Sequence, residues 1–545
     1  MDKRDAEIVV KNLLGRLRST GGDFELPSGI ISQMEKEALE LFSGLAANKP
    51  QIAHDFSEVT LAPIELELRC LSASPDASAI LCIDFGTAFS KAALWRTDET
   101  VPVPLDLARG ANPASTGVLL ESAVYITGDV VFFGPEAVEK YRLEDSPDRE
   151  LFASPKELLT HEVARLNVER PSKAVDPTGK FTSRALLTLY LAYLTAVVCD
   201  VLPAGIRRTV KRRYAAPGWG NAQADVQSKE MGAAARSLGD LLVDAQILAD
   251  TIDIIEWRNG LACERALELD RAIQAERSDP NRLGATFVER AVLEAVAAAS
   301  GIRDQFLNKR PQVLVVDVGA GTTDIGVFKF VNSPDAKGVV APYRGGMRAI
   351  QTAGNALDDA LIGLAQQKIG LPSGGDRSRR FRRRLGNVIR EAKATLCETG
   401  EIEIDVPDFP QTKIDLAEFE RTPTVKHFVR EFEANIVGAL EGSGASFRSF
   451  SDDSVAVFTG GGGSLPFLRN VLDKKAVSLK DGPAYFLIDD AIPDWVNRTL
   501  PDVSKLFPQI AVAAGGCSPF LPKETGVVGD TSDPGKRELT VFYKS

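Results

Sequence analysis

Two short segments of the sequence carry acidic, glycine and hydroxyl residues in the same order. The first is Asp-x-Gly-Thr at residues 84–87, and the second is Asp-x-Gly-x-Gly-Thr-x-Asp at residues 317–324. Each aspartate follows a run of apolar β-forming residues, so we expect it at the end of a buried strand. Glycines let backbone N–H groups approach phosphate oxygens, and the threonines add hydroxyl donors. Two carboxylates on opposite walls of a cleft suit a hydrated Mg²⁺ ion, which takes few direct protein ligands.

The segments around these motifs predict two matched hairpins. An apolar run over residues 79–84 turns through glycine and resumes at 90–95, and the same design returns at 313–317 and 323–330. A lone Asp-x-Gly-Thr after a strand is compatible with an ordinary hairpin. A second copy far downstream is not a solenoid period, and it predicts two related lobes that each open with one hairpin.

A third glycine-rich turn follows in the same order along the chain. The run 455–458 predicts a strand, residues 460–463 are four consecutive glycines, and residues 467–472 predict a helix. Four glycines leave room for a flat base or ribose against the backbone, and a helix start favours an anionic group. A flexible loop is the alternative interpretation.

Composition sets limits on the class of protein. At 545 residues the chain exceeds a single core, so two or more domains are expected. Its 64 Lys and Arg residues against 75 Asp and Glu residues give a formal charge of -11, which disfavours bulk attraction to nucleic acid or anionic lipid. The six cysteines are scattered, without a Cys-x-x-Cys pair, and indicate reduced core residues.

Targeting and membrane signals are weak in this sequence. The first residues lack the apolar core of a signal peptide. The most apolar segment, residues 185–202, is interrupted by Thr188, Thr195 and Asp200, so it favours a buried helix over a membrane span. We therefore expect a cytoplasmic protein.

The ordered set of two phosphate loops, a connecting helix, a glycine turn and a final Ala/Gly-rich helix resembles the superfamily of actin, sugar kinases and DnaK-type heat-shock chaperones. The second loop, Asp-Val-Gly-Ala-Gly-Thr-Thr-Asp at 317–324, is more similar to the chaperone form than to the sugar-kinase form. Further chaperone-like segments lie at 133–137, 154–158, 213–217, 293–299, 354–358, 391–396 and 511–516. The resemblance spans about residues 78–525. It implies an α/β, two-lobed actin-like ATPase fold, with duplicated ribonuclease-H-like lobes around a nucleotide cleft and an N-terminal extension.

The resemblance also suggests how the chain is divided. We expect an N-terminal extension over residues 1–77, lobe I over 78–310 with an insertion at about 222–290, and lobe II over 311–500. A closing helix over 501–525 should return to lobe I, followed by a tail over 526–545. Residues 74–78 resemble a short linker, and 289–299 predict a helix. The extension is expected to be a docking module, and a permanent brace on lobe I is the alternative.

The resemblance implies a set of site residues for ATP or ADP with Mg²⁺. Asp84 and Asp317 match the metal and water-positioning aspartates. Thr322 and the connecting-helix Glu294 complete the expected catalytic group. The residues expected to contact the nucleotide are Gly86, Thr87, Ala88, Gly319, Ala320, Gly321, Thr322, Lys393, Gly460, Gly461, Gly462 and Ser464.

Three positions depart from the family pattern. Val138 stands where the family has a catalytic lysine, with Lys140 two residues on. Ser464 and Ala394 replace arginines beside the adenine. Because phosphoryl transfer relies on charge neutralisation, these departures favour nucleotide binding with slow hydrolysis.

Two basic clusters, residues 207–213 and Arg377–Arg384, are typical of a solvated helix face or an ion-pair network at a lobe edge. An acidic partner is the alternative, and the scarcity of aromatic residues nearby disfavours nucleic acid.

The sequence thus predicts an ATP-binding, chaperone-like conformational switch and a slow Mg²⁺-dependent ATPase. We expect no peptide-binding domain after the closing helix. An unknown partner or client would then engage residues 1–77, the insertion or the Arg377–Arg384 cluster. Alternatives are a filament-forming actin relative and a nucleotide-sensing scaffold that does not hydrolyse. A small-molecule kinase is a further class, although no acceptor or general-base motif stands out.

Overall fold

The structure is a computed structural model of the chain. It describes residues 64–160, 166–216, 224–278, 287–306, 312–333, 336–444, 454–473, 476–489 and 492–521. The chain divides into two compact units, residues 1–63 and 64–545. The first unit contains most of the expected docking extension and lies outside the described residues, as does the expected tail.

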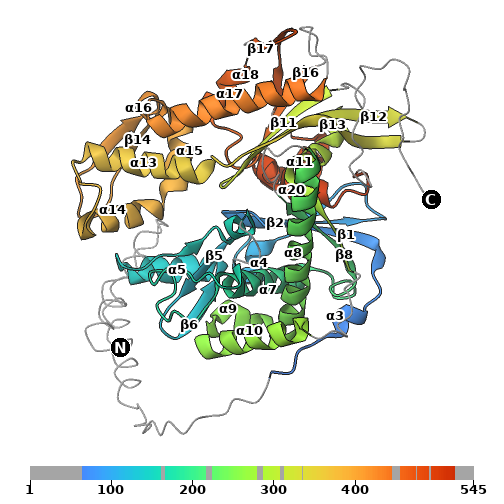
Figure 1. The fold of residues 1–545 in the computed structure, drawn as a ribbon, viewed down its shortest axis with the longest axis vertical. Coiled ribbons are helices and arrows are strands. Elements are labelled where there is room, and N and C mark those ends of the chain that lie inside the picture. The colour runs from blue at the N-terminus through green and yellow to red at the C-terminus, as the bar shows by residue number, and fades with distance from the viewer. Residues whose placement is uncertain are drawn as a thin grey trace, which may run out of the picture. The chain divides into compact units, whose positions relative to one another are not determined.

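Lobe I is built on a mixed sheet that contains the first hairpin (Figure 1). Its strand order is β10-β8-β1-β2-β3, with β4 paired to β2. The strands are β1 (Asp76–Asp84), β2 (Phe89–Arg96), β3 (Val103–Pro104), β4 (Leu120–Glu121), β8 (Val210–Ala216) and β10 (Val288–Leu293). The β1–β2 and β2–β3 pairs are antiparallel, whereas β1–β8 and β8–β10 are parallel.

Lobe II repeats this topology strand for strand. Its sheet runs β13-β12-β11-β16-β19. The strands are β11 (Gln312–Val318), β12 (Thr323–Ser333), β13 (Ala336–Ile350), β16 (Ser454–Thr459) and β19 (Leu487–Asp489). Again, one hairpin and its next neighbour are antiparallel, and the two strands on the other side are parallel. The two matched sheets confirm the duplicated α/β architecture that the repeated motif predicted.

The helices and small sheets of lobe I surround this core. They are α3 (Arg69–Ser72), α4 (Leu107–Ala111), α5 (Gly134–Glu144), the 3-10 helix η1 (Pro155–Thr160), α7 (Ser183–Val201), α8 (Ala224–Thr251), α9 (Ile254–Asn259), α10 (Cys263–Arg277), α11 (Glu294–Gly301) and α12 (Arg303–Phe306). A smaller sheet has the strand order β7-β5-β6-β9. Its strands are β7 (Phe152–Ala153), β5 (Ala123–Ile126), β6 (Val130–Phe133) and β9 (Leu261–Ala262).

Helix α7 is the apolar segment noted in the sequence. Thr182 caps its start by accepting a hydrogen bond from the Ala185 N–H. Among the described residues it is the one helix long and apolar enough to cross a membrane, but 83% of its most apolar window is buried inside the protein. Its apolar side chains are therefore part of the lobe I core.

The chain after β11 carries further helices and two hairpins, and the last of these helices packs on β1 and β2 of lobe I. The helices are α13 (Gly354–Lys368), α14 (Asp376–Gly386), α15 (Ile389–Thr399), α16 (Leu416–Glu420), α17 (Pro423–Ser443), α18 (Pro466–Leu472), α19 (Asp494–Thr499), η2 (Pro501–Leu506) and α20 (Phe507–Gly516). The hairpins pair β14 (Glu401–Ile404) with β15 (Thr412–Asp415), and β17 (Val477–Leu479) with β18 (Gly482–Ala484).

The expected closing helix is α20, and it packs closely against the connecting helix α11. Any Cβ at Gly301 or Gly515 would collide with the backbone of the other helix. The small residues of both helices therefore let their backbones approach at the junction between the lobes.

Two local expectations were wrong. The segment 289–299 is strand β10 followed by α11, because residues 288–293 pair with β8 and only the alanine-rich part after Glu294 is helical. The expected linker is part of lobe I: β1 begins at Asp76, whose N–H donates to the Thr209 carbonyl at 2.7 Å. The side chains of Cys70 and Leu71 in α3 are buried in the lobe I core, so residues 64–77 belong to that lobe.

Candidate functional site

The two motif aspartates stand at equivalent points of the two sheets. Asp84 and Asp317 are 4% and 5% exposed, respectively, near the ends of β1 and β11. In the first hairpin, Asp84 is paired across the strands with Lys91. In the second, Asp317 is paired in the same register with Asp324. Equivalent backbone positions thus carry opposite charges in the two lobes.

Two lysines meet the Asp84 carboxylate. The Lys91 Nζ donates to Asp84 Oδ2 at 3.0 Å. A Cβ built at Gly86 would lie 3.1 Å from this ammonium, which places Lys91 directly against the first phosphate loop. The buried Lys156, which comes from η1, lies with its Nζ 3.9 Å from Asp84 Oδ1.

Lys156 is held mainly by Glu294 at the start of α11, with which it forms a buried ion pair. Burial alone would lower the pKa of Lys156, but the negative charges of Glu294 and Asp84 outweigh burial and raise this pKa. The ammonium is therefore charged in the site. Glu294, expected to be a catalytic residue, thus contacts a cation that sequence reasoning missed.

The lobe II wall has an excess of carboxylate. Thr459 Oγ1 donates to Asp317 Oδ1 at 2.8 Å, and Thr322 Oγ1 donates to Asp324 Oδ2 at 3.1 Å. Burial, followed by the negative charge of Glu294, raises the pKa of Asp317 to about 7. A cation beside Asp317 would relieve this repulsion. Among the described residues no three His, Cys, Asp or Glu side chains form a metal-ligand group.

The two phosphate loops touch each other. A Cβ at Gly321 would lie only 2.7 Å from Thr87 Oγ1, so glycine is required where the loops meet. The second loop closes on itself through a 2.9 Å hydrogen bond from the Gly319 N–H to the Thr322 carbonyl. It also accepts a 2.8 Å bond at the Ala320 carbonyl from the Asn355 N–H at the start of α13. The first loop is fixed by the Ser122 N–H, which donates to the Ala88 carbonyl at 2.9 Å.

The third glycine turn backs the second loop. Gly460 has a φ of 78°, and a Cβ there would lie 2.9 Å from Asp317 Oδ1. The Gly462 N–H donates to the Val318 carbonyl at 2.9 Å. Gly461 and Ser464 are exposed, and a Cβ at Gly461 would have no atom within 4 Å. The turn therefore has a supporting side at Gly460 and Gly462, and an open side at Gly461 and Ser464.

Lys393 is already bonded within lobe II. Its Nζ donates to the Gly354 carbonyl at 3.0 Å and pairs with Asp358 Oδ1 at 2.6 Å. Both partners belong to α13, whose first residues hold the second phosphate loop. In this geometry Lys393 connects α15 to α13, and its contact with the nucleotide stays a prediction.

The position of the missing family lysine lies against a small apolar cluster of lobe I. Val138 is partly buried beside Tyr125 and Ala137. Lys140 pairs with Glu136 on its own helix at 2.9 Å and lies 5.4 Å from the centre of the Phe132 ring. The cations near Asp84 are Lys91 and Lys156 instead. Lys91 could have been found from the hairpin register, whereas no local signal pointed to Lys156.

The basic cluster at 207–213 is largely internal. Arg213 pairs with Glu289 at 2.7 Å and donates to the Ser518 carbonyl at 2.6 Å, which joins β8 and β10 to the chain after α20. The buried Arg212 donates to the Arg207 carbonyl at 2.6 Å. These contacts support the structural interpretation of this cluster.

Comparisons with known proteins agree with this geometry. A family model described as MreB/Mbl protein matches residues 267–481. Two curated relatives, both named Chaperone protein DnaK and from Thermoplasma volcanium and Thermoplasma acidophilum, are each 26% identical over 261 residues, which is 44% of this chain. The match covers 41% of the length of each relative. The chain has the actin-like ATPase fold, and these similarities lie within the superfamily that unites actin-like and DnaK-type ATPases.

Proposed function

We propose that this protein binds Mg²⁺-ATP and Mg²⁺-ADP between its two lobes and uses the nucleotide to set the arrangement of the lobes. The observation that carries the proposal is the meeting of the two phosphate loops, with Gly321 against Thr87 and the buried Asp84 and Asp317 beside them. A phosphate group at this point would be within reach of loops from both lobes, so its presence or absence changes what joins them.

The charged residues of the two lobes suit different parts of the ligand. On lobe I, Lys91 and Lys156 offer positive charge at the first loop and suit phosphate oxygens. On lobe II, the Asp317 carboxylate, oriented by Thr459, suits the waters of a hydrated cation. When bound, Mg²⁺ would supply neutralisation of phosphate charge. Because Lys91 already pairs with Asp84, we propose Asp317 rather than Asp84 as the main metal-side residue.

We infer that hydrolysis is slow. Lys156 is paired with Glu294, and Lys91 is paired with Asp84, so each ammonium is partly neutralised before a phosphate arrives. Little unpaired positive charge is left to stabilise the transition state of phosphoryl transfer. A slow ATPase with a long-lived bound state suits a chaperone-like conformational switch whose partner is not yet known.

Calorimetry tests the binding proposal. ATP and ADP are titrated into the full chain with Mg²⁺ and again with EDTA, and binding stronger than about 1 mM is expected for both nucleotides with Mg²⁺. Asp317→Asn is the test variant. Its matched control is Asp98→Asn, which makes the same change at an exposed aspartate in the turn after β2. A folded sample that binds neither nucleotide below about 1 mM would overturn the proposal.

A filament-forming ATPase is the second candidate, and the match of residues 267–481 to the MreB/Mbl family model favours it. Filaments would need self-complementary surfaces on the lobes. Sedimentation and light scattering with ATP, ADP and no nucleotide distinguish the two functions. Nucleotide-dependent pelleting supports filaments, and a monomer at all concentrations tested supports the switch alone.

A further inference from the structure

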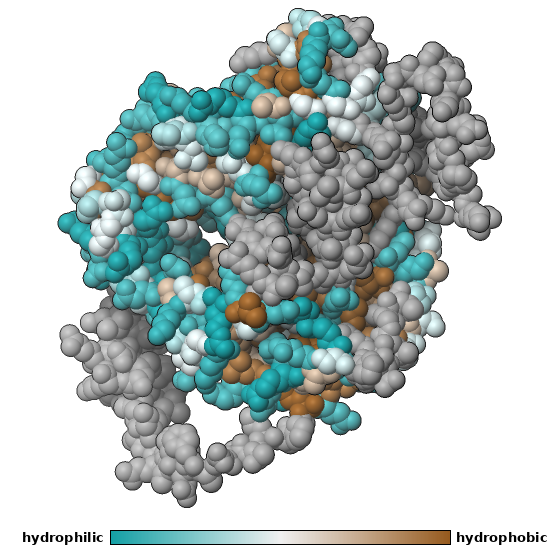
Figure 2. Space-filling model, viewed as in Figure 1, coloured by the Kyte–Doolittle hydropathy of each residue, from teal (hydrophilic) through white to brown (hydrophobic). Residues whose placement is uncertain are grey.

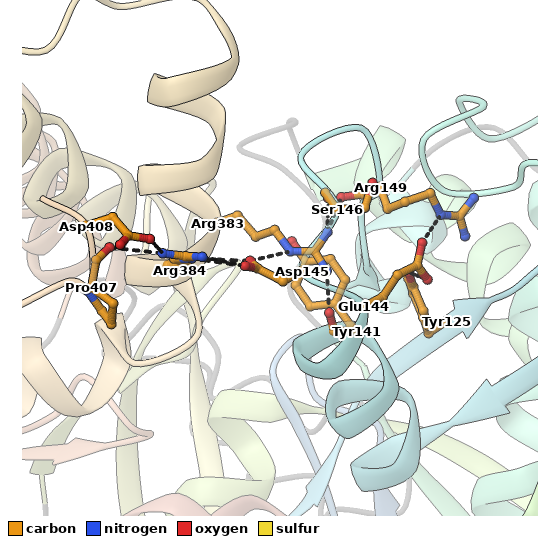
Figure 3. Close-up of polar contacts among 10 residues, drawn as sticks. All are labelled: Tyr125, Tyr141, Glu144, Asp145, Ser146, Arg149, Arg383, Arg384, Pro407 and Asp408. Atoms are coloured by element: carbon orange, nitrogen blue, oxygen red, sulfur yellow. Dashed lines mark hydrogen bonds and ion pairs between the residues drawn. The ribbon is translucent and has the colours of Figure 1, made fainter. Parts of the chain in front are cut away.

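Helix α14 presents little free positive charge. Figure 3 shows Arg383 and Arg384 extending from this helix towards the residues that follow α5. Arg384 pairs with Asp145 at 2.7 Å and with Asp408 at 2.8 Å. Arg383 donates to backbone carbonyls of the segment 141–149. These contacts favour the ion-pair interpretation of the Arg377–Arg384 cluster over an acidic partner.

A chain of buried hydroxyl groups, in contrast, lies directly behind the first phosphate loop. It consists of Ser90 of β2, Ser122 between β4 and β5, and Tyr190 of α7, and none of the three is more than 2% exposed. Ser90 Oγ lies 3.0 Å from Ser122 Oγ and 3.0 Å from Tyr190 Oη. Burial raises the pKa of Tyr190, so its hydroxyl keeps its proton at neutral pH. Because hydroxyl groups both donate and accept, each member can orient the next.

The hydroxyl chain ends on the loop itself. Ser122 Oγ donates to the Gly86 carbonyl at 2.7 Å, and the Ser122 N–H donates to the Ala88 carbonyl at 2.9 Å. Ser122 therefore holds two alternate carbonyls of the loop, one through its side chain and one through its backbone. The single hydroxyl proton of Ser122 goes to Gly86, so Ser122 accepts in its bonds with Ser90 and Tyr190.

Tyr190 contacts the chain on both sides of the same turn. Its ring centre lies 5.6 Å from that of Phe85, the residue before Gly86. Its hydroxyl bonds Ser90, four residues after Gly86. Tyr190 also donates to the Glu121 carbonyl at 3.1 Å, beside Ser122. The ring and the hydroxyl of Tyr190 thus fix the loop and the serine that holds it.

The position of the Gly86 carbonyl determines the direction of the next N–H. In a trans peptide the carbonyl of one residue and the N–H of the next point in opposite directions. The Gly86 carbonyl faces the buried Ser122, so the Thr87 N–H points away from the core. Gly86 is buried and Thr87 is half-buried. Within the described part of the chain, no protein acceptor bonds this N–H.

This N–H belongs to the loop that lies between the two lobes. Thr87 lies against Gly321 of the second phosphate loop. Figure 2 shows a hollow between the part of lobe II that carries α13 and α15 and the part of lobe I that carries α5. The space between the lobes is therefore open to solvent on this face, and a ligand there can approach the loops.

We propose that Ser122 is a positioning residue of the nucleotide site, which turns the Gly86 peptide so that the Thr87 N–H meets a phosphate oxygen. Ser90 and Tyr190 orient the Ser122 hydroxyl for this purpose. The inference rests on the proposed nucleotide binding. A backbone N–H bonds a charged acceptor more strongly than a neutral one, and a donor that is fixed in advance loses less entropy on binding. The hydroxyl chain thus adds affinity for phosphate without contacting it.

Calorimetry of the full chain with ADP and Mg²⁺ tests this role. Ser122→Ala should bind ADP about tenfold more weakly, because the Gly86 peptide loses its side-chain donor. Tyr190→Phe should weaken binding about threefold. It keeps the ring against Phe85 and removes only a hydroxyl one step further from the loop.

Two matched controls make the same chemical changes away from the loop. Ser378→Ala removes a buried hydroxyl that bonds Gln366, between α14 and α13 of lobe II. Tyr193→Phe changes the other buried tyrosine of α7, whose ring stacks on Phe133 and whose hydroxyl lies beside Gly134. Both variants should bind ADP as wild type does, even where their melting temperatures fall, because neither hydroxyl reaches the phosphate loop.

The Thr87 amide resonance gives a readout that a purely structural role would not change. The deuterated chain is labelled with ¹⁵N-threonine, and Thr87→Ser identifies the resonance. Mg²⁺-ADP should move the amide proton downfield in wild type and in Ser378→Ala, because the N–H gains a charged acceptor. The movement should be smaller in Ser122→Ala.

The outcomes separate this inference from the proposed function. A folded wild type that binds no nucleotide overturns the proposed site, and the positioning role with it. Nucleotide binding by wild type, with equal affinity and an equal Thr87 shift in Ser122→Ala, overturns the positioning role alone. Weaker binding in Ser122→Ala with an unchanged Thr87 shift would also contradict it, because the loss would then not pass through this N–H.

Discussion

The hairpins β1–β2 and β11–β12 share one register but place different residues opposite their aspartates. In lobe I, Asp84 faces Lys91 and the pair forms a 3.0 Å ion pair. In lobe II, Asp317 faces Asp324, and two threonine hydroxyls take the place of a cation. The repeated backbone therefore presents a carboxylate in an ion pair on one wall and carboxylates bonded to hydroxyl groups on the other.

This asymmetry shows how a duplicated fold can divide a single chemical task. Two identical hairpins would offer a phosphate either two cations or two anions. Here the lysines gather on lobe I, and the carboxylate with a pKa raised to about 7 by burial and by Glu294 lies on lobe II. A phosphate with its cation matches both walls, and each lobe alone matches one half of that ligand.

The largest effect is expected from Lys156→Met. Removing this buried ammonium leaves Glu294 without its cation and should cost about 3–5 kcal/mol of folding stability. Single-turnover ATP hydrolysis should fall about 100-fold, because positive charge near the phosphates is lost. Thermal unfolding and quenched-flow hydrolysis measure the two effects.

The double variant Lys156→Met with Glu294→Gln separates structure from chemistry. It should regain most of the lost stability, since the unpaired charge is gone, but none of the turnover. Recovery of hydrolysis together with stability would show that Lys156 serves only to neutralise Glu294.

Gly321→Ala should have an intermediate effect. The new methyl group would lie 2.7 Å from Thr87 Oγ1 and force the two phosphate loops apart. Nucleotide affinity should drop about tenfold, in line with the cost of overpacking one methyl group. Gly461→Ala is the control, because a Cβ there meets no atom within 4 Å. Equal affinities for the two variants would mean that the loops do not meet around the ligand.

The smallest effect is expected from Val138→Lys. This position is partly buried beside Tyr125 on the α5 side of lobe I, and the cations at Asp84 are already Lys91 and Lys156. Turnover should change by less than about threefold, a barrier change well under 1 kcal/mol. A rise of about tenfold or more would instead restore the sequence-based view that a lysine is missing here.

The sequence predicted the features of the two lobes that depend on local residue patterns. The alternating runs and glycine turns predicted both hairpins, and the repeat predicted two lobes. The Asp84–Lys91 pair was also within reach, because a tight hairpin sets which residues face each other. Lys156 was not, since η1 is brought to Asp84 by tertiary packing alone. Strand β10 was missed because pairing with β8 overrode the helical composition of residues 289–299.

The Mg²⁺ dependence of ADP affinity tests the division of charge between the lobes most directly. Calorimetry compares wild type, Asp317→Asn and Lys91→Met, each with Mg²⁺ and with EDTA. Asp317→Asn should keep at least wild-type affinity in EDTA and lose the gain that Mg²⁺ gives, because only the cation side is changed. Lys91→Met should bind about tenfold more weakly in both conditions, because a phosphate-side charge is lost. The same pattern in both variants, with or without Mg²⁺, would contradict the account.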